Sequence, residues 1–269
     1  PQDGDGKPRA PRDGEKPQKR PRTRGNKPAR PDMTSWKAPK AERSSEDSVC
    51  FQDFDLDPRI LRALVEELGF AECTTIQGMS LPHALAGKDL AGRAQTGTGK
   101  TAAFLITIFE HLLKDNSPRR PNQPYALILA PTRELAVQIN SDAEGIGCFS
   151  GVRHMAVYGG VEYQKQKQML EDGIDVVSAT PGRLIDYLRQ GAINLSCLKV
   201  LVIDEADRML DMGFIPDVRQ IVGRCPQPKD RQTMLFSATL SEDIMGLASK
   251  WMREAPVTLE ADPDQMVAD

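Results

Sequence analysis

The apolar residues show their first clear helical pattern shortly after residue 57. Asp57 is a residue type that caps helices, Pro58 suits the first helical position, and Gly69 suits the end. The apolar positions between them recur at helical spacing: Ile60, Leu61, Leu64, Val65 and Leu68. This pattern predicts the first packed helix of the chain.

Beyond that helix, short β-rich runs alternate with amphipathic helical stretches. The runs that predict strands are Asp89–Arg93, Tyr125–Ala130, Arg153–Val157, Asp175–Ala179, Lys199–Ile203 and Thr233–Phe236, with a further strand-like segment near residue 260. Regular alternation of this kind indicates an α/β fold with a mainly parallel β-sheet flanked by helices. In such sheets ligands bind beyond the carboxyl ends of the strands, so candidate chemistry is expected there.

The first 48 residues have a different character from the rest of the chain. They are rich in Pro, Gly, Lys and Arg and show no apolar periodicity, so we expect a disordered basic tail over residues 1–48. Although the whole chain carries a net charge of -3, the stretch from Lys7 to Arg30 holds ten basic residues against Asp13 and Glu15. Such an arm either contacts nucleic-acid phosphates or serves as a solvated linker, and both readings stay open.

Composition limits the compartment and the number of domains. A chain of 269 residues with 39% hydrophobic residues is sufficient for one globular domain plus the tail. The five cysteines form no metal-ligand spacing, which favours a reducing, cytoplasmic environment, and no apolar run is long enough to span a membrane. Because the sequence starts at Pro1 and stops soon after a strand-like segment, we expect a piece of a longer protein.

One Gly-rich segment follows a predicted strand and opens a predicted helix. It consists of Ala94, Gln95, Thr96, Gly97, Thr98, Gly99, Lys100 and Thr101. In this context backbone N–H groups and the helix N-terminus bind phosphates, a Lys reaches the β- and γ-phosphates, and a Thr hydroxyl ligates Mg²⁺. Ala94 stands where the usual pattern has Gly, and an unliganded Gly-rich turn is the alternative. The spacing predicts an ATP site in which Lys100 is also catalytic.

The apolar run Lys199–Ile203 ends in the tetrapeptide Asp204-Glu205-Ala206-Asp207. Carboxylates at the end of a buried strand suit nucleotide hydrolysis: we expect Asp204 to hold the magnesium shell and Glu205 to orient or deprotonate the attacking water. An acidic helix start is the alternative, because Asp and Glu are favoured at helix N-termini.

The spelling of that tetrapeptide resembles the signature of the DEAD-box RNA helicases, and the likeness covers residues of about 50–260. It implies a RecA-like ATP-binding domain over residues 78–262, preceded by an adenine-reading segment over residues 49–77. In that segment Gln77 would hydrogen-bond the adenine edge and Phe51 would stack on its rings. Phe51 as a core anchor and Gln77 as a surface amide remain alternatives. Cys73 stands where the family often has Pro.

Three further segments resemble the RNA-contact motifs of that family. They supply Pro131, Thr132 and Arg133, then Gly159 and Gly160, then Thr180, Pro181, Gly182 and Arg183. Hydroxyls, helix N-terminal amides and Arg at strand ends bind phosphates without reading bases, although well-capped helix starts would look the same. Ser237 and Thr239 resemble the motif that couples hydrolysis to duplex opening, and the resemblance assigns them catalytic roles.

The resemblance also implies RNA-stimulated ATP hydrolysis coupled to local duplex unwinding, with a second RecA-like domain supplying arginines to the transferring phosphate. Its motifs do not occur in these residues, so we expect weak nucleotide binding, little hydrolysis and no unwinding. Similarity to bacterial members that act in RNA degradation implies association with an endoribonuclease complex. Two other readings are a P-loop kinase or transport ATPase, and an RNA clamp that binds through the basic tail.

Overall fold

The computed structural model describes residues 36–41 and 43–261 of the 269-residue chain. The helices are α1 (Pro58–Arg62), α2 (Thr75–Leu85), α3 (Lys100–Lys114), α4 (Arg133–Gly147), α5 (Tyr163–Asp172), α6 (Pro181–Arg189), α7 (Ala206–Asp211), α8 (Ile215–Val222) and α9 (Glu242–Trp251). Three short helical segments of other types are η1 (Phe51–Asp53), η2 (Ala63–Glu67) and η3 (Pro228–Asp230). The strands are β1 (Leu90–Arg93), β2 (Ala126–Leu129), β3 (His154–Val157), β4 (Val176–Ala179), β5 (Val200–Ile203), β6 (Gln232–Ser237) and β7 (Val257–Glu260).

The strands form one sheet in the order β3-β4-β2-β5-β6-β1-β7, and every pairing in it is parallel. All six strands predicted with bounds are confirmed to within about one residue at each end, and β7 is the strand-like segment expected near residue 260. The α/β prediction is therefore confirmed. Parallel strands buried on both faces explain why their sequences read as continuous apolar runs.

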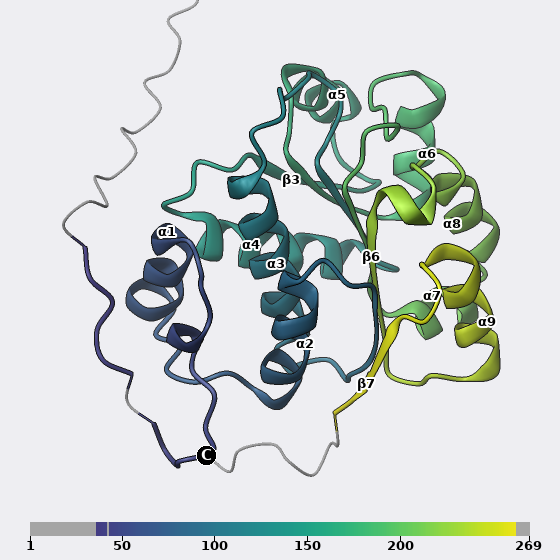
Figure 1. The fold of residues 1–269 in the computed structure, drawn as a ribbon. Helices are drawn as coiled ribbons and strands as arrows, with labels where there is room; N and C mark the ends of the chain where they lie inside the picture. Colours follow the sequence, from purple (N-terminus) through teal and green to yellow (C-terminus); the bar gives the residue numbers. More distant parts are fainter. Residues whose placement is uncertain (1–35, 42, 262–269) are drawn as a thin grey trace, which may run out of the picture.

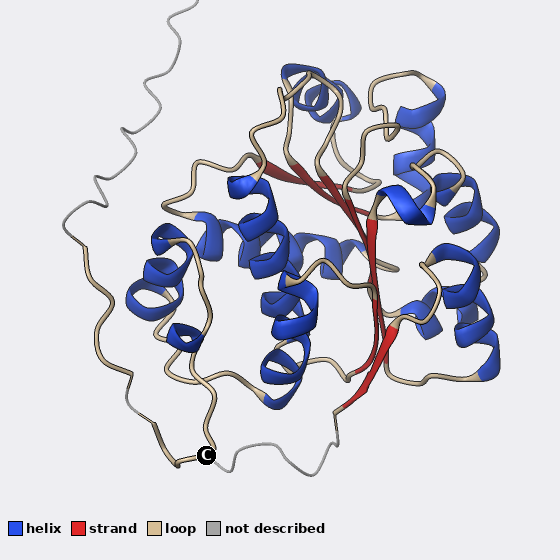
Figure 2. Cartoon of the chain, in the orientation of Figure 1, coloured by secondary structure: helices blue, strands red, loops and turns tan. Residues whose placement is uncertain are grey.

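Helices cover both faces of the sheet, which Figures 1 and 2 show nearly edge-on. Side chains of successive strand residues point to opposite faces, so Ile128 packs with α1–α4 while Leu127 and Leu129 pack in the other core. That second core is completed by α6, α8 and α9, for example by Trp251. The result is a three-layer sandwich in which strand ends, rather than faces, are open to ligands.

The first predicted helix begins where expected. The Asp57 carboxylate accepts a hydrogen bond from Arg59 N at 2.9 Å, and Pro58 occupies the first helical position. The α-helical hydrogen bonding ends at Arg62, after which Ala63–Glu67 forms a single π-type segment. Gly69 then reverses the chain at a φ of +65°, a conformation that glycine adopts without steric cost.

The predicted tail lies mainly outside the described residues, and this includes the whole basic stretch from Lys7 to Arg30. Its last part, residues 36–41 and 43–48, has neither helix nor strand but lies against the domain. The indole N–H of Trp36 donates to Glu66 at 2.6 Å, Arg43 pairs with Asp53, and Ser44 hydrogen-bonds Glu72. Part of the segment that the sequence assigned to the tail therefore contacts the domain.

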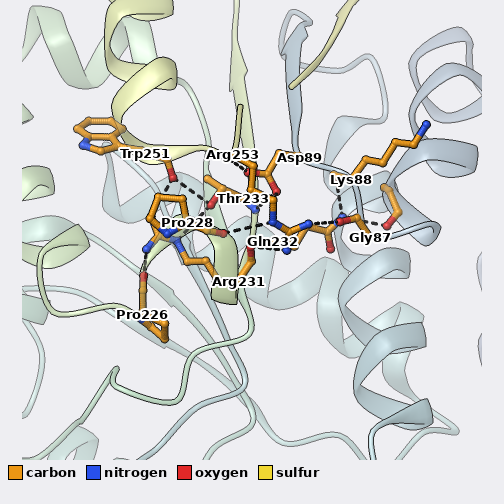
Figure 3. A network of polar contacts seen from close by, with 11 residues as sticks. Gly87, Lys88, Asp89, Pro226, Pro228, Arg231, Gln232, Thr233, Trp251 and Arg253 are labelled. Carbon is orange, nitrogen blue, oxygen red and sulfur yellow. Dashed lines mark hydrogen bonds and ion pairs between the residues drawn. The ribbon is translucent and has the colours of Figure 1, made fainter. Parts of the chain in front are cut away.

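A polar network closes the amino-terminal ends of β1, β6 and β7 (Figure 3). Asp89 accepts hydrogen bonds from Thr233 N at 3.0 Å and Arg253 N at 2.8 Å. Arg231 donates to the carbonyl oxygens of Pro226 and Trp251 and to the Thr233 hydroxyl. These contacts fix the chain before each strand, so that the carboxyl ends of the same strands are held in register. Among residues 36–41 and 43–261, no helix has the length and apolar character needed to cross a membrane.

Candidate nucleotide and nucleic-acid site

The Gly-rich segment connects β1 to α3 at the carboxyl edge of the sheet. Ala94 N donates to Ser237 O at 2.9 Å, so the loop continues the pairing of β1 with β6 before it turns. Gly97 and Gly99 have φ values of +86° and +88°. At Gly99 a Cβ atom would also lie 2.5 Å from the Gln77 amide nitrogen. Backbone geometry and crowding therefore both require glycine at position 99.

Lys100 and Asp204 form a buried ion pair below this loop. The Lys100 Nζ lies 2.7 Å from Asp204 Oδ1, and the two side chains are 4% and 0% exposed. Burial raises the pKa of the Asp204 carboxyl, although the Lys100 charge opposes the shift. Asp204 Oδ2 is buried and accepts no hydrogen bond from any described residue. A buried carboxylate oxygen without a partner is costly, which indicates that a ligand completes its coordination.

Glu205 adopts a backbone conformation that is rare for a residue with a side chain. Its φ and ψ are +52° and +53°, and it stands at the start of α7. The Glu205 carboxylate accepts hydrogen bonds from the Thr96 hydroxyl at 3.1 Å and from Arg208 at 3.2 Å. Strain of this kind persists where the surrounding structure holds a residue in place, and it is common at functional sites. Here the conformation brings the Glu205 carboxylate, just after β5, against Thr96 of the Gly-rich loop that follows β1.

The donors at this point suit a magnesium ion that is shared with phosphates. Within residues 36–41 and 43–261 no cluster of three or more His, Cys, Asp or Glu side chains could hold a metal ion by itself. Mg²⁺ needs no such cluster, because it retains water and combines one or two carboxylates with substrate phosphates. The free Asp204 Oδ2 and the Thr101 hydroxyl, at the start of α3, fit that requirement.

The segment expected to read adenine borders a cavity of about 490 Å³ beside the Gly-rich loop, with Phe70 and Gln77 in its lining. The Gln77 amide is partly engaged already: its oxygen accepts from Thr74 N at 2.9 Å and its nitrogen donates to Gly99 O at 3.0 Å. One amide hydrogen and one lone pair remain for a ligand. Gln77 is buried, so the structure does not favour the alternative of a surface amide.

Phe51 does not line this cavity. Its side chain has no exposed surface and lies against Phe70, with ring centroids 6.2 Å apart. Because the ring is covered in this structure, the arrangement favours the core-anchor alternative for Phe51. Phe70, to which no role was assigned from the sequence, is the aromatic residue in the cavity lining. Its position next to Gly69, at a chain reversal, was the available signal.

The three segments expected to contact RNA come together beside β2, β4 and β3. The Arg133 guanidinium lies over the Tyr158 ring, 4.9 Å from its centroid, and Arg183 lies over Tyr163 at 5.2 Å. Their guanidinium nitrogens approach the two glycines, since Cβ atoms built on Gly160 and Gly159 would lie 3.6 Å from Arg133 and 4.0 Å from Arg183. Two stacked arginines thus flank an exposed Gly-Gly turn.

The other members of these segments are mostly structural in their visible contacts. Thr132 caps α4, where its hydroxyl accepts from Leu135 N at 3.3 Å, and Thr180 stands at the cap position of α6 without a side-chain cap bond. Pro131 and Pro181 are buried, whereas Gly182 is exposed. Sequence reasoning missed Tyr158 and Tyr163, which hold the two arginines; aromatic residues on either side of the Gly-Gly pair were the signal.

The segment with Ser237 and Thr239 is tied to the acidic tetrapeptide. Asp207 N donates to the Ser237 hydroxyl at 3.2 Å, and Ala238 N donates to the Asp207 carboxylate at 3.1 Å. Ser237 is fully buried and Thr239 is exposed. These two hydrogen bonds join the end of β6 to the start of α7, so a displacement of one segment would strain its bonds to the other.

Comparisons with known proteins agree with this arrangement. Residues 74–247 match the family model described as DEAD/DEAH box helicase. The chain is 52% identical over 217 residues to an ATP-dependent RNA helicase RhlB from Erwinia tasmaniensis, covering 80% of this chain and 50% of that protein. Over 211 residues it is also 52% identical to RhlB from Xanthomonas oryzae, covering 77% of this chain and 36% of that protein.

A solved structure supports the same assignment. The crystal structure of a DEAD box protein from the hyperthermophile Methanococcus jannaschii superposes with a TM-score of 0.71 at 35% identity, covering 79% of this chain and 56% of that one. The chain spans half or less of the length of the RhlB proteins described above. Because the family model and the RhlB relatives are described as helicases, the alternative of a P-loop kinase or transport ATPase is not supported. The chain therefore belongs to the DEAD/DEAH box helicase family, with a RecA-like fold and a marked resemblance to bacterial RhlB.

Proposed function

We propose that this chain is the ATP-binding domain of an ATP-dependent RNA helicase. The observation that carries the proposal is the buried Lys100–Asp204 pair, in which one Asp204 oxygen has no partner. The pair lies directly below a loop whose glycines leave backbone N–H groups free for phosphates. An unsatisfied carboxylate next to a phosphate loop is expected where ATP and Mg²⁺ bind together.

In this proposal each residue of the ATP site has a separate task. The backbone from Gln95 to Gly99 cradles the phosphates, and Lys100 moves from Asp204 toward the β- and γ-phosphates when they arrive. Thr101 and Asp204 would hold Mg²⁺, which would supply positive charge next to the phosphoryl oxygens. Glu205, positioned by Thr96 and Arg208, orients the attacking water and accepts its proton.

Base recognition falls to the cavity beside the loop. The remaining donor and acceptor of the Gln77 amide match the adenine edge, and Phe70 supplies the ring that stacks on the base. This assigns to Phe70 the role that the sequence suggested for Phe51. Because Gln77 also binds Gly99 O, occupation of the base site and the shape of the phosphate loop are directly linked.

RNA is proposed to lie across the edge formed by Thr132, Arg133, Gly159, Gly160 and Arg183. Stacking on Tyr158 and Tyr163 orients the two guanidinium groups in advance, which lowers the entropy cost of binding phosphates. Contacts of this type position a strand without reading its sequence. Through Asp207, the Ser237–Thr239 segment would transmit the state of the ATP site toward this edge and so couple hydrolysis to duplex opening.

The proposal is tested by ATP·Mg²⁺ binding to residues 1–269, measured by calorimetry. Lys100→Ala is expected to lower the affinity about 10- to 100-fold, because a charge-assisted contact to phosphate is lost. The matched control is Lys114→Ala, at the other end of α3, where the side chain is 59% exposed. Equal ATP affinity in Lys100→Ala and the control would contradict the assigned site.

Glu205→Gln tests the hydrolytic role separately. It is expected to lower single-turnover hydrolysis about 10²-fold or more while ATP affinity changes little, because the amide cannot accept the proton. For residues 1–269 alone we propose slow hydrolysis with little stimulation by single-stranded RNA and no unwinding, since arginines from a second domain are needed. Vigorous RNA-stimulated turnover by this chain would contradict that part. Single-stranded DNA and no polymer serve as comparisons.

Partners and compartment follow from the same resemblance. The RhlB relatives are named as RNA helicases, and we propose RNA as the partner of this chain, in a cytoplasmic setting consistent with five free cysteines. Association with an RNA-degrading endoribonuclease complex is a further proposal. Whether the tail contributes to RNA affinity is tested by deleting residues 1–35, since unchanged affinity would exclude the clamp reading.

A further inference from the structure

The cavity beside the Gly-rich loop is also lined by residues of α4, which have no role in the ATP site proposed above. Besides Phe70 and Gln77, its lining includes Gln138 and Asp142 of α4. The start of α3, with Lys100 and Thr101, lies in the same lining. The α4 side chains therefore belong to the space that holds the nucleoside if the proposed ATP site is right.

Asp142 is a carboxylate with spare accepting capacity. Its Oδ1 atom accepts one hydrogen bond, from the Gln138 side-chain amide at 2.8 Å. No Lys, Arg or His among the described residues forms an ion pair with it. It is half-buried, and burial raises the pKa of its carboxyl, with the Gln138 hydrogen bond acting in the opposite direction. An ionised carboxylate only accepts hydrogen bonds, so the free accepting positions of Asp142 suit a ligand that offers O–H or N–H donors.

A second Gln–Asp pair in the chain shows what this pair does without a cavity. The Gln168 amide donates to Asp172 at 2.9 Å on α5, with the same four-residue spacing. Both of those side chains are exposed, and neither lines the cavity described above. A pair of this type stabilises a helix by only about 0.2–0.5 kcal/mol. The difference between the two pairs is thus their surroundings rather than their local geometry.

We propose that Asp142, held in place by Gln138, accepts a hydrogen bond from a ribose hydroxyl of the bound nucleotide and so distinguishes ribonucleotides from deoxyribonucleotides. This inference rests on the proposed ATP site. Gln77 already offers a donor and an acceptor to the base edge, and Lys100 and Thr101 face the phosphates. The sugar lies between base and phosphates, and its hydroxyls are the donors that suit a carboxylate, as in dinucleotide sites.

The test measures ATP, 2′-deoxy-ATP and 3′-deoxy-ATP binding to residues 1–269 by calorimetry. The unmodified chain is expected to bind at least one deoxy analogue about tenfold more weakly than ATP, the effect of one hydrogen bond to a charged group. In Asp142→Asn, ATP affinity should fall toward that of the analogue, so that the ratio approaches 1. Asp172→Asn, the matched control, should keep the ratio of the unmodified chain.

Several results would overturn the inference. If the unmodified chain binds both deoxy analogues as tightly as ATP, or if Asp142→Asn weakens all three nucleotides equally, Asp142 does not read the ribose. Purine riboside triphosphate, which lacks the 6-amino group, separates the base from the sugar. If Asp142→Asn changes the ratio of ATP affinity to the affinity for this analogue, and leaves the ratios for the deoxy analogues unchanged, Asp142 contacts the adenine edge instead. Failure of the unmodified chain to bind ATP would overturn the proposed function as well.

A second variant keeps the test independent of folding. Gln138→Met retains the length of the side chain and the Asp142 carboxylate but removes the amide that orients it. It is expected to reduce the discrimination against the deoxy analogue about threefold, because the carboxylate gains rotational freedom. Unchanged discrimination in both Asp142→Asn and Gln138→Met would refute the role of the pair. Thermal melting of each variant beside Asp172→Asn checks the fold.

Discussion

The two ends of one parallel sheet bury charges in opposite ways. At the amino-terminal ends, Asp89 and Arg231 are buried and both find partners, most of them backbone atoms of β6, α9 and the adjoining loops (Figure 3). At the carboxyl ends, Lys100 and Asp204 are equally buried, but Asp204 Oδ2 has no partner in the described protein.

This contrast separates structural from functional burial. A buried charge whose hydrogen bonds are complete contributes to holding strands in register, and its loss exposes unpaired carbonyl groups. A buried charge whose hydrogen bonds are incomplete costs stability until a ligand arrives. The amino-terminal end therefore holds the strands in place, and the carboxyl end leaves Asp204 Oδ2 free for the ATP and Mg²⁺ of the proposed site.

The largest effect on stability is expected at the structural end. Arg231→Met should lower the free energy of unfolding by about 3 kcal/mol, because the carbonyls of Pro226 and Trp251 and the Thr233 hydroxyl lose their donor. Chemical denaturation measures this, with Arg224→Met at an exposed position as the control. An Arg231→Met protein as stable as the control would remove the structural role of the network.

The functional end should respond with the opposite sign. Replacing the ion pair by Lys100→Met together with Asp204→Leu should leave the free energy of unfolding unchanged or raise it by about 1–4 kcal/mol, because a costly buried pair is exchanged for apolar packing. ATP binding should be lost in the same protein. Denaturation in buffer without nucleotide and metal is the measurement, and a strong loss of stability would show that the pair is structural after all.

A pH experiment sharpens the contrast at a second amino-terminal carboxylate. Burial tends to raise the pKa of Asp175, but hydrogen bonds from Arg153 and the charges of Arg153 and Arg119 outweigh it and lower the pKa overall. A lowered folded-state pKa stabilises the protein above the unfolded value of about 3.9, and this stabilisation is lost as the pH falls through the folded value.

Asp175→Asn should therefore be less stable than the unmodified chain at neutral pH, by about 1–2 kcal/mol. The difference should shrink as the pH falls below about 4, because Asp175 then binds a proton in the unfolded chain but stays ionised in the folded protein until its lowered pKa is reached. Denaturation curves between pH 3 and 7, ~one pH unit apart, follow the change. A difference that does not vary with pH would mean that the ion pairs of Asp175 contribute nothing.

The smallest effect concerns RNA at the carboxyl edge. Arg133→Gln should weaken single-stranded RNA binding by about 1 kcal/mol and reduce the salt dependence of binding by about one charge, because one phosphate contact is lost. Arg120→Gln, an exposed arginine in the connection that enters the amino-terminal end of β2, is the control and should change neither quantity. Equal losses in both variants would indicate diffuse electrostatic attraction instead of a defined edge.

Much of this arrangement was predictable from local sequence. Parallel strands buried on both faces must be apolar throughout, so the run Lys199–Ile203 indicated a central strand, which β5 confirms. Asp57-Pro58 and Gly69 marked the ends of the first helical region because capping and positive φ depend on neighbouring residues alone. The positions of the Gly-rich loop and the acidic tetrapeptide at strand ends were predictable for the same reason, because each segment directly follows a strand and precedes a helix in the sequence.

Distances across the fold decided the rest. Phe51 and Phe70 are both aromatic residues near the adenine segment, and only packing determined that Phe51 is covered while Phe70 faces the cavity. The stacking of Arg133 on Tyr158 and the shared cavity of Asp142 and Gln77 bring together segments 25 and 65 residues apart. Their relation depends on how helices cross the sheet.

By itself, then, the sequence determined the order of elements, the chemistry at each strand end and the family. It could do so because hydrogen bonding and chain reversal are local, and because a buried parallel strand leaves an apolar signature. The tertiary structure alone decided which buried groups are satisfied and which are not. That property depends on every neighbour at once. For buried charges it distinguishes the amino-terminal end of the sheet, where Asp89 and Arg231 are paired, from the carboxyl end, where Asp204 Oδ2 lacks a partner; the uncharged amide oxygen of Gln232 is unpaired at the amino-terminal end.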